Sequence, residues 1–146
     1  MAAPSAPVIR LGRTLRGGLA PSIYGLVERG VLKRPELAGA VRGRVQLRFG
    51  DGYPPVAMIF GVDEIEVFDG EAEGVDLTVT ADLADVVLLT TAPLRMGMPS
   101  PTSARGRAVL GKMARGEVRL SGDLGLARAM LTLMRIDVPE ARFAEA

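Results

Sequence analysis

The chain has 146 residues, 48% of them hydrophobic, which suits one domain with a substantial buried core. It contains no cysteine and no histidine, so disulfides, thiolate nucleophiles, imidazole bases and the commonest zinc ligands are excluded and a reducing, cytoplasmic setting is expected. The formal net charge of +1 conceals an asymmetry, because residues 1–50 carry nine Lys or Arg against two acids, whereas residues 51–85 carry ten acids and no base.

Residues 1–20 are interpreted as a basic N-terminal arm. Arg10, Arg13 and Arg16 are spaced among apolar residues, and three glycines interrupt the stretch, which favours a flexible arm or a short helix. The same arginines make a secretory signal a poor interpretation, and no run of about 18 apolar residues predicts a membrane span. One hypothesis is that the arm touches an anionic membrane, with each arginine contributing on the order of 1 kcal/mol.

Residues 21–146 are expected to form the folded domain, which begins with a helix over 22–34. Ser22 is the expected cap of this helix and Pro35 ends it. Period-two alternation then predicts four strands joined by short turns, and we interpret them as an antiparallel meander. The strands are expected over 41–49, 55–60, 64–67 and 75–80.

One strand face of this meander is basic. Its arginines are expected to pair across strands with acids of the meander, and the aromatic residues that stack on bases are not interleaved with them, so no nucleic-acid binding is predicted. The arginines are Arg42, Arg44 and Arg48, and the acids include Glu64 and Glu66.

Helical spacing follows the meander. Asp82 is the expected cap of a helix that Pro93 ends, and Asp123 is the expected cap of a final apolar helix over 124–136. Between these helices we expect an ordered loop over 93–103, a helix over 104–115 and a short strand over 117–121.

The order of these elements, together with two segments, resembles the sterol carrier protein type-two family of lipid-binding domains. One segment runs from Gly116 to Asp123 (GEVRLSGD) and leads into the apolar helix, and the other runs from Val75 to Asp85 (VDLTVTADLAD). The resemblance implies an α+β fold, in which a five-stranded, predominantly antiparallel sheet has helices packed on one face and encloses an apolar tunnel. It also implies an apolar lipid as ligand, whether a sterol, a fatty acyl chain or an isoprenoid.

Ten apolar side chains are candidates for the lipid-binding lining. Flexible methionines adapt to ligands of varied shape, but ordinary core filling accounts for the same residues. The alternative function is therefore an accessory or protein-interaction module of the same fold with a filled core. The candidates are Phe60, Val86, Leu89, Met96, Met98, Leu110, Met113, Met130, Leu133 and Met134.

Motifs for other chemistry are incomplete. The stretch from Gly106 to Lys112 matches the first part of a phosphate-binding loop, but Met113 stands where Ser or Thr is required. A calcium-loop pattern that starts at Asp69 has Thr80 where a bidentate Glu belongs. We predict no cofactor, no metal and no enzymatic activity. An enzyme would need an acid and a base among residues that have structural explanations, namely Tyr24, Tyr53, Asp82 and Asp85.

Overall fold

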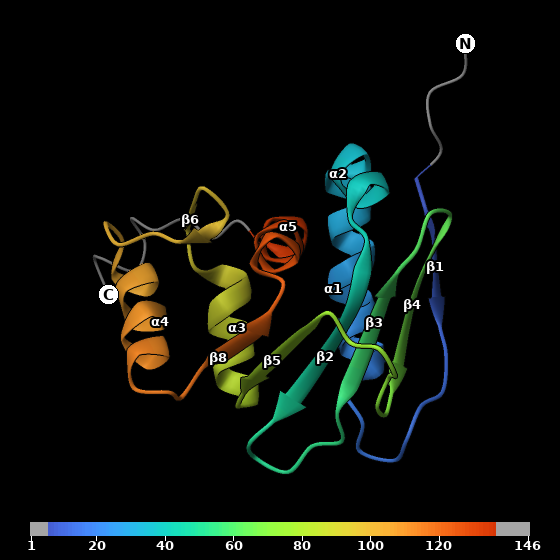
Figure 1. The fold of residues 1–146 in the computed structure, drawn as a ribbon, viewed down its shortest axis with the longest axis horizontal. Helices are drawn as coiled ribbons and strands as arrows, with labels where there is room; N and C mark the ends of the chain where they lie inside the picture. The colour runs from blue at the N-terminus through green and yellow to red at the C-terminus, as the bar shows by residue number, and fades with distance from the viewer. Residues whose placement is uncertain (1–5, 137–146) are drawn as a thin grey trace.

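The computed structural model describes residues 6–136, which form a six-stranded mixed sheet, five helices and a small hairpin (Figure 1). The sheet has the order β1-β4-β3-β2-β5-β8. Its strands are β1 (Val8–Leu11), β2 (Gly43–Phe49), β3 (Val56–Phe60), β4 (Glu64–Asp69), β5 (Leu77–Ala81) and β8 (Arg119–Gly122). The helices are α1 (Ala20–Lys33), α2 (Pro35–Ala40), α3 (Leu83–Thr91), α4 (Ala104–Ala114) and α5 (Leu124–Met134).

The expected α+β class is confirmed, but the sheet has six strands rather than five. β2, β3 and β4 form an antiparallel meander, as expected. The prediction of a fourth meander strand is wrong, because β5 pairs in parallel with β2, with Leu77 opposite Val45 and Val79 opposite Leu47. Alternation of apolar and polar residues sets which face of a strand is buried, and it does not identify the neighbouring strand.

Residues 70–76, here called the crossover, carry the chain from β4 to β5 over the polar face of β2. Gln46 of β2 is only 1% exposed, and its Nε2 donates to the carbonyl oxygens of Val56 (3.2 Å) and Gly70 (3.0 Å). Its Oε1 accepts from the backbone N–H of Ala72 at 2.8 Å. Since these groups are shielded from water, the amide of Gln46 satisfies backbone atoms that would otherwise be buried without partners.

The arginines that flank Gln46 also bind the crossover. Arg44 donates to the carbonyl oxygen of Glu73 at 2.8 Å, and Arg48 forms an ion pair with Glu71 at 2.6 Å. These contacts correct the prediction that the basic strand face pairs with Glu64 and Glu66. Their partners are residues that follow β4 along the chain, the carboxylate of Glu71 for Arg48 and the backbone carbonyl of Glu73 for Arg44.

Part of the N-terminal arm is a strand, not a helix or a free segment. β1 pairs in parallel with β4 along the outer edge of the sheet. Arg10 binds two carboxylates of β4, Glu64 and Glu66, each at 2.9 Å. β1 therefore covers the edge of β4, and its Arg10 offsets the charge of these two acids.

A buried carboxylate determines where α1 begins. Asp69, at the end of β4, is fully buried, and its two oxygens accept from the backbone N–H groups of Leu15 (2.8 Å) and Ala20 (3.1 Å). The helix starts at Ala20, two residues before Ser22, so the prediction that Ser22 is the cap is wrong. Asp69 is distant in sequence but meets one of the backbone donors that a helix N-terminus leaves without an intrahelical partner.

The other helix starts agree better with the sequence. Asp123 Oδ1 accepts from the backbone N–H of Leu126 at 3.1 Å, which confirms it as the cap of α5. Asp82 occupies the cap position of α3, but its side chain makes no capping bond. Asp51 accepts instead from the backbone N–H of Leu83 at 3.2 Å.

The hydrophobic core lies between the inner face of the sheet and helices α1, α3 and α5. Val45, Leu47 and Met58 face it from the strands. α1 and α5 approach so closely that a Cβ on Gly30 would overlap the carbonyl oxygen of Leu133. Glycine at this position allows the two helix backbones to pack directly against each other.

We expect Gln46→Ala to lower the free energy of unfolding by about 2–3 kcal/mol, because it leaves buried backbone groups of the crossover without hydrogen-bond partners. The matched control is Arg48→Ala, which removes an exposed ion pair of the same strand face and should cost only about 0–1 kcal/mol. Urea denaturation with an unchanged m-value would measure both. Equal losses in the two variants would show that Gln46 does not hold the crossover.

Candidate apolar binding site

A small apolar void lies between the two layers of the fold. Its volume is about 20 Å³, which is enough for roughly one water molecule and far below the about 300–1,000 Å³ of typical ligand pockets. The side chains that line it are Leu47, Met58 and Val79 from the strands, Val86, Leu89 and Thr90 from α3, and Met130, Leu131 and Met134 from α5. These nine residues line a small, partly enclosed void, and the expected tunnel is not shown among residues 6–136.

The wall of the void is apolar in character. Thr90 is its one hydroxyl residue, and Thr90 Oγ1 donates to the carbonyl oxygen of Val87 on its own helix at 2.9 Å. The remaining lining consists of aliphatic side chains and three methionines. Methionine is unbranched and fills irregular spaces in more than one shape. A wall of this kind suits alkyl groups and gives a polar ligand little to bind.

Contacts at both ends fix the position of α5 over the void. At its start, the backbone N–H of Asp123 donates to the carbonyl oxygen of Asp76 at 2.9 Å. Near its C-terminal end Arg34 donates to the carbonyl oxygens of Leu133 and Arg135, each at 3.3 Å. The backbone N–H of Ile136 donates to the carbonyl oxygen of Thr90 at 2.7 Å and thereby joins the ends of α5 and α3.

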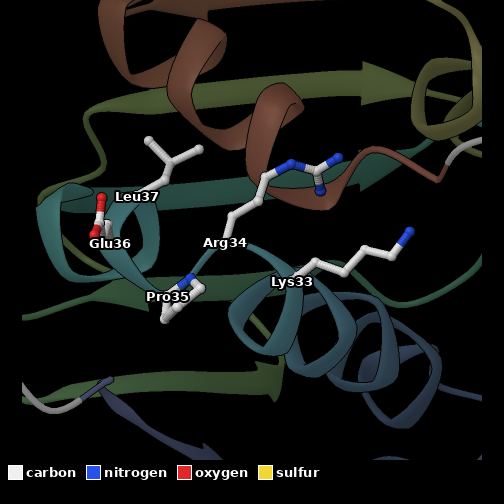
Figure 2. Close-up of a pocket in the computed structure, with 5 residues that line it drawn as sticks. All are labelled: Lys33, Arg34, Pro35, Glu36 and Leu37. Carbon is white, nitrogen blue, oxygen red and sulfur yellow. The ribbon is translucent and has the colours of Figure 1, made fainter.

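A second hollow lies on the surface where α1 meets α2 (Figure 2). Its volume is about 370 Å³, and Figure 2 shows Arg34 reaching from this junction toward α5. The residues that line it are Lys33, Arg34, Pro35, Glu36 and Leu37. None of the ten candidate lining residues is among them. Because three of these five side chains are charged, this hollow is a poor enclosure for an apolar guest.

The structure brings four of the ten candidates together around the void: Val86, Leu89, Met130 and Met134. Two others are buried elsewhere in the core, Leu133 next to α1 and Phe60 at the end of β3. Three are half-buried, namely Met98, Leu110 and Met113. The interpretation of Met96 as a lining residue is wrong, because its side chain is 87% exposed.

Sequence reasoning missed five lining residues. Leu47 and Val79 occupy inward positions of alternating strands, and Met58 lies in the wholly apolar strand. The alternation identified their faces, so the inward positions of β2 and β5 could have been included. The remaining two, Thr90 and Leu131, follow the helical spacing of their neighbours.

The residues considered for acid–base chemistry have separate structural roles. Asp85 pairs with Lys112 of α4 at 3.0 Å, and Asp82 precedes α3. Tyr53 packs edge-on against Phe49, with ring centroids 6.1 Å apart, and Tyr24 packs against the core. Within residues 6–136, no group of three or more Asp or Glu side chains is arranged to hold a metal ion. None of the helices described here combines the length and apolarity that a membrane crossing requires.

Comparisons with known proteins identify the fold. No family model and no curated protein matches the chain, whereas solved structures do. A UbiJ-SCP2 ubiquinone synthesis protein aligns at 16% identity over 80% of this chain and 88% of its own, with a TM-score of 0.56. Sterol carrier protein domain 2 of Helicoverpa armigera aligns at 19% identity over 83% of this chain and 92% of its own, with a TM-score of 0.56. Sterol carrier protein 2 of Yarrowia lipolytica, in its apo form, aligns at 14% identity over 82% of this chain and 92% of its own, with a TM-score of 0.52.

We expect Leu89→Ala to lower the free energy of unfolding by about 2–5 kcal/mol, because it enlarges the void that Leu89 lines. Val87→Ala, on the exposed side of the same helix, should change it by no more than about 0.5 kcal/mol. Thermal and urea unfolding of both variants would measure the difference. Similar stabilities for the two variants would contradict the placement of Leu89 in the buried interior.

Proposed function

We propose that this chain, which has the fold of sterol carrier protein 2 domains, binds an apolar lipid between the inner face of its sheet and helices α3 and α5. The ligand is a sterol, a fatty acyl chain or an isoprenoid, and no bond of it is made or broken. The observation that carries this proposal is the wall of the void, to which both layers contribute aliphatic side chains and methionines. Such a wall offers a lipid chain apolar contact along its length.

Binding requires the void to enlarge. The most adaptable parts of its wall are Met58, Met130 and Met134, whose side chains can change rotamer without breaking a hydrogen bond. α3 and α5 face each other across the void, and Ile136 and Thr90 hold their ends together. A lipid chain would thus enter by displacing methionine side chains and spreading the two helices between their fixed ends.

The second candidate function is an accessory or protein-interaction module with a filled core. The volume of the void favours it, because about 20 Å³ leaves no space for an alkyl tail in the closed state. The similarity to a protein named for ubiquinone synthesis is compatible with an accessory role. The two candidates differ in one measurable property, which is whether the interior opens for a ligand.

A fluorescent fatty acid titrated into the purified protein should show saturable binding. Val86→Phe adds more atoms than the void can take, so the affinity should fall about tenfold or more. Leu89→Ala enlarges the void, so binding should be retained or strengthened. The control is Val87→Phe, which carries the same new side chain on the exposed neighbouring position and should leave the affinity unchanged.

Circular dichroism and thermal unfolding would establish that each variant is folded at the temperature of the titration. Absence of saturable binding in the unmodified protein, up to the solubility limit of the probe, would exclude the lipid-binding proposal and leave the filled-core module. Equal weakening by Val86→Phe and Val87→Phe would place the binding site elsewhere on the protein.

A further inference from the structure

The tip of the β6–β7 hairpin exposes an apolar side chain at a strained position. The hairpin consists of β6 (Leu94–Arg95) and β7 (Met98–Pro99), and its two central residues have positive φ angles, 55° at Met96 and 79° at Gly97. A turn of this type prefers Asn-Gly, and a non-glycine residue with positive φ carries a conformational cost. Met96 is 87% exposed, so packing against the described residues does not offset this cost. A local conflict without a folded-state gain indicates a functional position.

Cations surround this tip. Gly97 lies against α5, where a Cβ on it would be 2.8 Å from the Cβ of Arg128. Arg95 and Arg128 are both exposed, and neither forms an ion pair with any residue between 6 and 136. One turn before Arg128, Leu124 is 53% exposed on the same side of the helix. Arg95, Met96, Leu124 and Arg128 are here called the hairpin surface.

The charges of the hairpin surface itself are those of Arg95 and Arg128. Residues 86–116 contain five Lys or Arg and no acid, but Lys112 pairs with Asp85 and Arg115 pairs with Glu117. Asp123, which precedes Leu124, is an exposed acid. The ten acids of residues 51–85 include those that bind the arginines of β1 and β2. Figure 1 shows the hairpin above α3 and beside α5, away from those strands. The hairpin surface therefore combines two protruding apolar side chains with two exposed arginines that form no ion pair among residues 6–136.

We propose that the hairpin surface docks on an anionic lipid bilayer. Met96 and Leu124 enter the interfacial region, while Arg95 and Arg128 bind lipid phosphates and carboxylates. This surface is a better candidate than the N-terminal arm, where Arg10 is bound by two carboxylates and Val8–Leu11 belong to the sheet. Docking does not depend on the interior binding a lipid. A negative result for membrane docking therefore does not exclude lipid binding in the interior, and a negative result for lipid binding does not exclude docking.

The test is co-sedimentation with phosphatidylcholine vesicles prepared with and without phosphatidylserine. The unmodified protein should pellet with the phosphatidylserine vesicles, and salt should weaken the binding. Arg95→Ala with Arg128→Ala should lower the partition coefficient about 25-fold, on the basis of roughly fivefold per arginine. Met96→Asn should lower it about tenfold through loss of apolar contact. Because Asn suits the turn, this variant should keep or raise the melting temperature.

The matched control removes two exposed arginines of the arm, Arg13→Ala with Arg16→Ala, and changes the net charge by the same amount. It should lower the partition coefficient by less than about threefold, as expected for charges distant from the docked surface. A loss equal to that of the hairpin variants would overturn the proposal, as would an absence of binding to phosphatidylserine vesicles. If the protein does not bind phosphatidylserine vesicles, its self-association should be measured. Self-association that is lost in the double variant Arg95→Ala, Arg128→Ala would show that the surface binds the acidic side of a second copy.

Discussion

The architecture depends on the attachment of the crossover to the polar face of β2. Gln46 uses both ends of one buried amide to bind residues 70 and 72, and this attachment delivers the chain to the free edge of β2. β5 then runs parallel to β2, and α3, which follows directly, lies over the opposite face with Val86 and Leu89 against Leu47. The apolar void is thus positioned by hydrogen bonds on the other side of the sheet.

The sequence predicted the elements well and their pairing poorly. Alternation of Val45, Leu47 and their polar neighbours identifies a half-buried strand, but the same pattern serves an antiparallel or a parallel neighbour. The cap of α5 is local and was predictable, since Asp123 and Leu126 are three residues apart. The start of α1 was not, because it depends on Asp69, which comes from a strand about 50 residues later.

At the site too, contacts between residues close in sequence were predictable and contacts between distant segments were not. Four of the candidate lining residues, Val86, Leu89, Met130 and Met134, do line the void, because residues three and four positions apart share a helix face. Met96 was misplaced because apolar character alone does not separate a core residue from an exposed one. Gly97 alone is compatible with a turn, but Met is not a residue that this turn prefers, so the sequence offers little reason to place Met96 at a hairpin tip.

The restraints on α5 limit how a ligand can reach the interior. The backbone N–H of Asp123 at its start donates to the carbonyl oxygen of Asp76. At its end, the carbonyls of Leu133 and Arg135 accept from Arg34, and the N–H of Ile136 donates to Thr90. Detachment of the whole helix would break all of these bonds, whereas rotation of Met130 and Met134 would break none of them. Because a methionine rotamer change costs little and the hydrogen bonds are partly shielded from water, side-chain displacement is the easier route. The interior therefore opens, if a lipid binds there, between helices whose ends stay in place.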